Sequence, residues 1–203
     1  MPTLRACLLN CSLKPSGPSS TQVLLDEVAV ELRAQGVEIG KAVRVAAHDV
    51  RPGVTSDEGD GDAWPAIRRQ VLDAQILVFG TPIWLGHPSS VAQRVLERMD
   101  AFLGETDDRG QVAAVDRVAM VAVVGNEDGA HHVSAELFQG LSDVGFTIPA
   151  SGMTYWVGRA MEGTDYRDLD ETPEAVASAT RLAVANAVHL AGLLAVSGYP
   201  PVS

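Results

Sequence analysis

Short apolar runs alternate with longer segments of helical periodicity along this chain, and this alternation restricts its possible folds more than any other feature. The apolar runs lie at residues 4–9, 42–47, 76–79, 118–124 and 146–149. Runs that are apolar throughout are typical of parallel strands buried on both faces. Right-handed crossovers between such strands would place helices on both faces of one sheet. The sequence therefore predicts a doubly wound α/β fold with a five-stranded parallel sheet in the order 2-1-3-4-5.

The predicted helices follow the strands in turn. They cover residues 20–35, 64–74, 89–103, 130–144 and 173–196. Ser19, Ser20 or Thr21 can cap the first helix, Gly36 ends it, and Pro173 starts the last one. Residues 154–172 are polar and are predicted to be irregular. No break in composition divides the chain, so residues 1–203 are predicted to form a single domain.

The chain is acidic, and its charge limits the partners it can have. It has 15 Lys and Arg against 26 Asp and Glu, a formal net charge of −11. Without a basic stripe, such a surface repels both the phosphates of nucleic acids and anionic membranes. We therefore expect neither nucleic acid nor membrane as a partner. The Gly-rich acidic segment 53–62 is interpreted as a solvated loop.

Cysteine usage and the ends of the chain favour a cytoplasmic protein. Cys7 and Cys11 lie in or just after the first strand, where a mutual disulfide would have poor geometry, and buried free thiols are expected there. The first residues turn polar too soon for a signal peptide. The apolar stretch 182–196 is interrupted by Asn186 and His189. It is predicted to be too short to cross a bilayer and to form a core-packed helix.

Ligands bind to open parallel sheets beyond the carboxyl ends of the strands, and the loop after the first strand suits an anion there. Ser12, Ser19, Ser20 and Thr21 precede a helix whose free N–H groups favour negative charge, and Lys14 can add to it. A phosphomonoester would fit this loop. The alternative is that these residues make only a turn and a helix cap.

The loops after the third and fourth strands offer an aromatic ring and close backbone approach. The first of them contains Pro82, Ile83, Trp84, Leu85 and Gly86. Trp84 should stand at the mouth of the sheet, where a planar ligand could pack on it, although a Trp at the edge of the core is the alternative. The second loop contains Gly125, Asn126, Glu127, Gly129 and His131. Its glycines permit unusual dihedral angles next to a ligand.

A metal site is not expected in the second of these loops, although Glu127, Asp128, His131 and His132 resemble one. The adjacent carboxylates point in divergent directions, and the spacing is unlike that of known ligand sets. The sequence also lacks a hydrolase elbow, a dinucleotide fingerprint and a nucleophile with an evident base. A site without its own acid, base or nucleophile is expected where a cofactor carries the reaction.

These three loops together resemble the NAD(P)H-dependent FMN reductase family of flavodoxin-like proteins. The resemblance covers about residues 4–150, and the segment after the third strand is its most specific part. It implies that Ser12, Lys14, Ser20 and Thr21 surround the phosphate of FMN. It also implies that residues 82–86 lie along the isoalloxazine ring, with Trp84 beside it, and that residues 125–129 complete the pyrimidine side.

The resemblance leads to an enzyme hypothesis and two alternatives. NADPH or NADH would reduce bound FMN, and the flavin would then pass two electrons to a small-molecule acceptor such as a flavin or quinone. A flavodoxin-type electron carrier, which would not react with NAD(P)H, is the first alternative, and the acidity favours it. A receiver-like domain is the second, but Asn10 and Cys11 stand where receivers need acidic residues.

Some features of the hypothesis stay open in the sequence. The choice between NADH and NADPH and the identity of the acceptor are not predicted. Tyr155 and Trp156 could shape the flavin face or cover the edge of the core, and His131 could contact a ring oxygen or be structural. Because an exposed flavin is often covered by a neighbouring subunit, we expect a homodimer or homotetramer.

Overall fold

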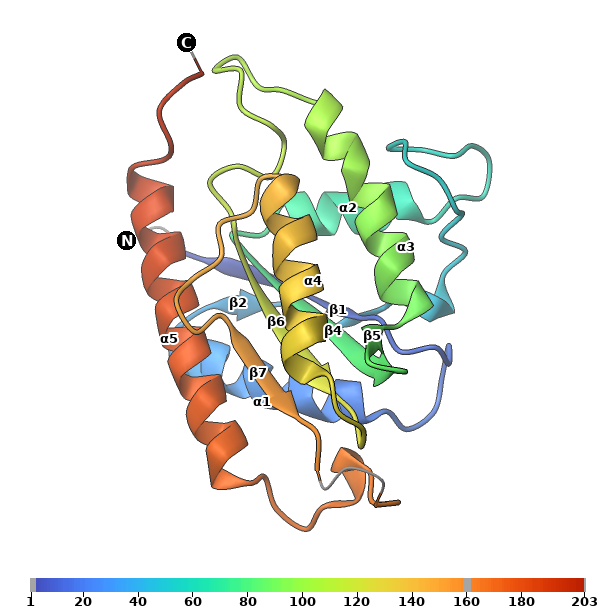
Figure 1. Cartoon of the computed structure of the whole chain (residues 1–203). Coiled ribbons are helices and arrows are strands. Elements are labelled where there is room, and N and C mark those ends of the chain that lie inside the picture. The colour runs from blue at the N-terminus through green and yellow to red at the C-terminus, as the bar shows by residue number, and fades with distance from the viewer. Residues whose placement is uncertain (1–2, 159–161, 203) are drawn as a thin grey trace.

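The computed structural model describes residues 3–158 and 162–202 and shows a sheet with helices on both faces (Figure 1). The sheet runs in the order β2-β1-β4-β6-β7, with parallel pairing along this path. Counted along the chain, these are the second, first, third, fourth and fifth principal strands. The predicted order is therefore confirmed, and it is the order of flavodoxin-like folds.

The strands are long in the centre of the sheet and short at its edges. They are β1 (Arg5–Asn10), β2 (Glu38–Ile39), β3 (Val43–Arg44), β4 (Ile76–Trp84), β5 (His87–Pro88), β6 (Val118–Val124) and β7 (Met153–Trp156). Both β2 and β3 pair with β1, and β5 turns back antiparallel on the end of β4. The sheet thus has seven strands among the described residues, where five were predicted.

Helices cover both faces of the sheet. They are α1 (Ser20–Ala34), α2 (Trp64–Leu72), α3 (Ser90–Met99), α4 (Ala130–Asp143) and α5 (Glu174–Val196), with short 3-10 helices at η1 (Val45–Ala47), η2 (Asp100–Gly104) and η3 (Tyr166–Asp168). Alternate residues of β4 point to opposite faces. Leu77 and Phe79 pack with α2, α3 and α4, whereas Ile76 and Val78 pack with α1 and α5. The two cores share the central sheet, as expected for strands that are apolar throughout.

Two predicted strands differ from those observed. The segment 42–47 is a strand only at Val43–Arg44, because the chain then turns into η1. The segment 146–149 makes a single bridge, between Thr147 and Val118, and the edge strand is β7 instead. Pro149 has no N–H to donate, and its carbonyl accepts from Gly152 in a turn that precedes β7. The segment 154–172 is therefore not irregular throughout, and its residues 159–161 lie outside the described part.

The acidic loop is tied to the core more firmly than its composition predicted. The side chains of Asp62 and Arg98 are fully buried, and Asp62 Oδ2 lies 2.7 Å from Arg98 Nη2. Arg98 also donates to the carbonyl oxygens of Arg51 and Thr55. Most of segment 53–62 is exposed or half-buried, but its last residue anchors it to α3. The interpretation as a wholly solvated loop was wrong at Asp62.

The last helix, α5, spans residues 174–196, which confirms the predicted helix 173–196, and it extends beyond the apolar stretch 182–196. With 23 residues, α5 is long and apolar enough to span a bilayer by length and composition, and 28% of its most apolar part is buried in the protein. Val184 and Ala187 pack in the core, as predicted, whereas Leu182 and Leu193 are exposed. The prediction that the segment is too short to cross a membrane was therefore wrong in length.

Candidate functional site

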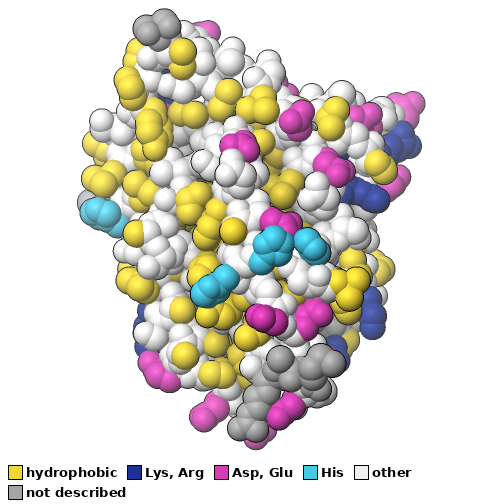
Figure 2. All heavy atoms as spheres, in the orientation of Figure 1, with side chains coloured by type: hydrophobic (Ala, Val, Ile, Leu, Met, Phe, Trp, Pro, Cys, Tyr) yellow, Lys and Arg dark blue, Asp and Glu magenta, His cyan; other side chains and the backbone are white. Residues whose placement is uncertain are grey.

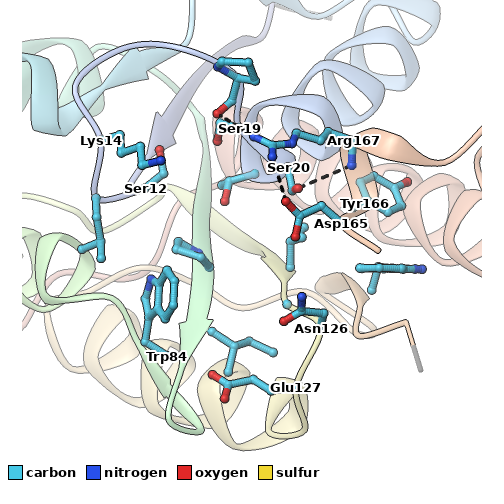
Figure 3. A pocket seen from close by; sticks show the side chains of 18 of the residues that line it. Ser12, Lys14, Ser19, Ser20, Trp84, Asn126, Glu127, Asp165, Tyr166 and Arg167 are labelled. Atoms are coloured by element: carbon cyan, nitrogen blue, oxygen red, sulfur yellow. Dashed lines mark hydrogen bonds and ion pairs between the residues drawn. The ribbon is translucent and has the colours of Figure 1, made fainter. Parts of the chain in front are cut away.

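A pocket of about 440 Å³ lies at the carboxyl ends of the central strands, where the fold predicted a ligand site (Figure 3). Most of the predicted site residues line it. They are Ser12, Lys14, Ser19, Ser20, Thr21, Pro82, Ile83, Trp84, Gly125, Asn126 and Glu127. Three loops that are distant in the sequence therefore meet around one cavity.

Four predicted site residues do not line this pocket. Leu85 and Gly86 form the tip of a hairpin beyond it, and Gly129 lies against the backbone of Gly86. His131 is on the first turn of α4, where its Nε2 lies 3.1 Å from the hydroxyl of Tyr155. The two rings pack edge to face, so His131 and Tyr155 pair with each other on the exposed surface. This geometry favours a structural role for His131 and Tyr155 over contact with a ligand.

The loop after β1 has a shape set by buried polar contacts. Asn10 is fully buried; its Oδ1 accepts from the N–H of Ser12 and its Nδ2 donates to Gln22. This Asx turn directs the chain away from the strand and around the pocket. Ser89 donates to the carbonyl of Cys11 over 2.5 Å, which links this loop to the start of α3. The pocket wall is therefore held before any ligand arrives.

Ser19 caps α1, as predicted. Its side chain accepts from the N–H of Gln22 over 3.2 Å. The hydroxyl of Ser19 is thus committed to the helix, and the backbone N–H groups of the first turn remain as donors for a ligand. Because Thr21 is only 2% exposed, Ser20 is the more accessible of the two hydroxyls that follow the cap.

Two arginines that the sequence interpretation missed join Lys14 at this end of the pocket. Arg44, at the end of β3, donates to the carbonyl of Gly17 over 2.7 Å and contacts the hydroxyl of Ser12 over 3.3 Å. Arg167, on η3, lies across the start of α1, where its backbone N–H donates to Ser20 Oγ (Figure 3). Asp165 also lines the pocket and pairs with Arg167 over 3.0 Å, so Lys14 and Arg44 contribute most of the positive charge near the helix N-terminus. In a chain of net charge −11, this local positive charge favours an anion.

One nitrogen of Arg44 supports this assignment. Its Nε is buried and has no hydrogen-bond partner within residues 3–158 and 162–202. A buried N–H without a partner is costly unless a ligand or water accepts from it. Arg44 could have been suspected only from the strand predicted at 42–47, whose carboxyl end should also meet the ligand.

The other end of the pocket is apolar and open. Trp84 closes β4 at the pocket mouth and is 53% exposed. Leu85 and Gly86 both have positive φ, which gives the tight two-residue turn between β4 and β5. Leu85 is an unusual residue for this conformation, and it is 88% exposed. Leu85 thus stores backbone strain at the tip of the hairpin, next to Trp84 of the pocket mouth.

Glu127 lines the pocket between these two ends. Its Oε1 is buried and has no hydrogen-bond partner in the described part of the chain. A carboxylate in this situation accepts readily from a polar N–H of a ligand. Gly125 lies two residues before Glu127 and has no space for a side chain, because a Cβ there would lie 2.9 Å from the Cβ of Ile83.

The back of the pocket is built by the last residue of β7 and the first residue of η3. Trp156 and Tyr166 line it, and their rings pack at 5.3 Å. Burial and then the neighbouring carboxylate of Glu27 raise the pKa of Tyr166 well above its usual value. Its hydroxyl therefore stays protonated and donates to Glu27 over 2.6 Å. Trp156 faces the pocket, whereas its neighbour Tyr155 does not line it.

Comparison with known proteins identifies the family of the chain. Residues 4–162 match the model of the NADPH-dependent FMN reductase family. The chain belongs to this family. The resemblance inferred from the three loops is therefore confirmed, and so is the flavodoxin-like fold class.

Two proteins resemble this chain over most of its length. The 8-demethyl-8-aminoriboflavin-5'-phosphate synthase of Streptomyces davaonensis is 32% identical over 97% of this chain and 80% of that protein. A crystal structure of RosB with bound 8-demethyl-8-formylriboflavin-5'-phosphate has a TM-score of 0.87 and 32% identity. It covers 97% of this chain and 82% of that one.

A third relative is much longer than this chain. The divalent metal cation transporter MntH of Mycobacterium bovis is 38% identical over 81% of this chain. The chain spans only a quarter of the length of that protein.

The pocket residues fit the FMN that this family binds. The phosphate requires an anion site, which the cations and the N-terminus of α1 provide. The planar ring requires an apolar slot with few polar contacts. Trp84 and Ile83 provide the apolar surface, and Glu127 Oε1, which has no hydrogen-bond partner among the described residues, provides a polar contact. Both ends of the pocket thus match the chemistry of a phosphorylated planar molecule.

Proposed function

We propose that this chain is an FMN-dependent oxidoreductase that takes electrons from NADPH or NADH and passes them to a small-molecule acceptor. The observation that carries the proposal is the local cation cluster at the start of α1, where buried Arg44 Nε has no partner in the described part of the chain. Such a site suits the terminal phosphate of FMN.

Each group at this end has its own role in holding the phosphate. Arg44 is already oriented by Gly17 and Ser12, so its guanidinium loses little freedom on binding. Lys14 is exposed and adds charge. Arg167 is restrained by Asp165, which lies 3.0 Å away. The backbone N–H groups at Ser20 and Thr21 complete the set of donors.

When bound, FMN would supply the redox chemistry, namely acceptance of a hydride from a reduced nicotinamide and later donation of two electrons. The chain contributes binding and shape. Trp84 borders the apolar end, and Glu127 and Asn126 offer polar contacts there. Because this end is open to solvent, a nicotinamide and then an acceptor such as a quinone or a free flavin can use the same opening.

An anaerobic titration tests the proposal. The protein is purified with FMN, and its visible spectrum is followed after NADH or NADPH is added. Rapid bleaching of the flavin supports the oxidoreductase and identifies the donor. Bound flavin that is reduced only by dithionite would contradict it and favour the electron carrier. No retention of FMN would contradict both.

A second candidate follows from the relatives that span most of the chain. The Streptomyces protein is named as the synthase of an altered riboflavin phosphate, and the second candidate function is therefore modification of FMN as a substrate. Mass spectrometry of the flavin after aerobic incubation with an amino-group donor separates the two functions. An unchanged FMN mass supports a cofactor, and a changed mass at the benzene ring supports modification of the flavin.

We also propose that the protein is a cytoplasmic homo-oligomer. Exposed apolar side chains at Leu182, Leu193 and Val196 on α5, and at Leu85 on the rim, favour a homodimer or homotetramer. Light scattering coupled to gel filtration tests this part, and a monomer at working concentration would contradict it. Buried thiols at Cys7 and Cys11 agree with a reducing compartment.

A further inference from the structure

Three side chains that can ligate a metal meet beside the pocket but outside it. His87 is on β5, and His132 and Glu136 are on α4. Glu136 Oε1 lies 2.9 Å from His87 Nδ1 and 2.6 Å from His132 Nε2. One ligand atom from each residue lies within 4.8 Å of the other two. Figure 2 shows histidine side chains gathered next to a carboxylate on this face.

The fold brings these residues together by two local features. His132 and Glu136 are four residues apart, so they lie on one face of the helix. Gly129 lets the start of α4 approach the hairpin, since a Cβ at this position would lie 2.9 Å from Gly86 Cα. The rings of His87 and His132 then pack edge to face at 5.1 Å. A close backbone contact thus sets the distance between the two elements.

Two imidazoles and one carboxylate are a ligand set that Zn²⁺ and related ions accept, with a fourth position left for water. Ligand atoms in a tetrahedral zinc site are about 3.3 Å apart, as follows from bonds of about 2.0 Å. The separations of 2.9 and 2.6 Å from Glu136 Oε1 must widen slightly to reach this value, and small rotations of the exposed side chains of His87 and His132, which are 62% and 58% exposed, allow it. The same exposure lets an ion enter from solvent.

We propose that His87, His132 and Glu136 bind a divalent transition-metal ion such as Zn²⁺, which joins the β4–β5 hairpin to α4. The sequence prediction found no ligand-like spacing outside residues 127–132, because His87 lies far from His132 and Glu136 in the sequence and meets them only in the fold. The ion would restrain the turn of this hairpin. Trp84, the last residue of β4, pairs with His87 there and borders the pocket. This site does not depend on the proposed binding of FMN.

Calorimetric titration of the tag-free protein with ZnCl₂ tests the site. We expect one ion per chain, and binding weakened about tenfold or more in each of His87→Ala, His132→Ala and Glu136→Gln. His189→Ala is the matched control, because His189 is an exposed histidine on α5. Absence of saturable binding, or equal binding by all variants, would overturn the proposal.

Hydrogen exchange tests the proposed restraint. With Zn²⁺ bound, amide exchange in residues 84–88 should slow in the wild type and should not change in Glu136→Gln. Saturable binding without this protection would overturn the link between the ion and the hairpin. Because neither measurement involves flavin, a failure here is distinguishable from a failure of the FMN proposal.

Discussion

The two ends of the pocket are built in opposite ways. At the phosphate end, Asn10, Ser19 and Arg44 are each held by hydrogen bonds to other parts of the protein. At the hairpin end, Trp84 and Leu85 are largely exposed, and Leu85 has a strained backbone. A rigid polar end suits a ligand that is always the same, whereas an open apolar end suits varied reaction partners. Under the proposed function, the difference predicts that cofactor and substrate are recognised by different ends of the pocket.

The largest effect is expected from breaking the ion pair between Asp62 and Arg98, which anchors segment 53–62 to α3. In Asp62→Asn, the buried guanidinium of Arg98 loses its counter-charge, and unfolding should become easier by about 3–5 kcal/mol. Denaturant unfolding measures this change. Asp57→Asn, a substitution in the exposed part of the same loop, is the control and should have little effect.

The same pair predicts a pH dependence. Burial opposes ionisation of Asp62, but hydrogen bonds from Arg98 and from three backbone N–H groups outweigh it and hold its pKa well below the usual range. The carboxylate therefore stabilises the fold at pH values above its unfolded pKa of about 3.9, and this contribution is lost as the pH falls toward the lower folded pKa. Asp62→Asn should lack this acid-dependent loss. An identical acid profile in both proteins would contradict the assignment.

The next effect concerns the phosphate end. Arg44→Gln should weaken FMN binding about 10- to 100-fold, because it removes a charge-assisted contact of about 1.5–3 kcal/mol. Riboflavin, which lacks the phosphate, should bind equally well to both proteins. Fluorescence titration with the two flavins measures the ratio. Lys41→Gln is the control, because it removes an exposed cation outside the pocket. An equal loss of FMN affinity in this variant would show that only the overall charge of the protein matters.

A smaller effect is expected at the hairpin end. Leu85→Asn relieves an unfavourable left-handed conformation and should stabilise the protein by about 1 kcal/mol. FMN binding should not change, because Leu85 does not line the pocket. The KM for the acceptor should rise if the exposed side chain contacts it. Thermal unfolding and steady-state kinetics check these outcomes, and weaker FMN binding would contradict the separation of the two ends.

The smallest effect is expected at the cysteines, which belong to neither end. Burial raises the pKa of the Cys7 thiol to about 12 and raises that of Cys11 further. Both should remain unreactive toward a thiol reagent at neutral pH until the protein unfolds. Rapid labelling of the native protein would show that the β1 region opens more easily than its packing indicates.

The sequence predicted what depends on local patterns. Fully apolar runs identified the central strands β1, β4 and β6, and turn residues after them identified the three loops that line the pocket. Short edge strands such as β3 were less predictable, since their pairing depends on contacts with β1 rather than on composition. For this reason Arg44 was missed, although it occupies a strand end like the others.

Contacts between distant segments were not predictable from local patterns either. Arg167 reaches the pocket because η3 packs on α1, and no motif in residues 162–172 indicates this. The pairing of Asp62 with Arg98 and the approach of His87 to Glu136 have the same origin. In each case a charged residue that appears solvated in the sequence acquires its partner only through the fold.

Under the proposed function, the pocket recognises a flavin by its phosphate. The most direct test is to measure the affinities of the flavin-free wild-type protein for FMN and for riboflavin under the same conditions. The cation site predicts that FMN binds at least about 100-fold more tightly, as expected for several charge-assisted contacts. Equal affinities for the two flavins would contradict the account.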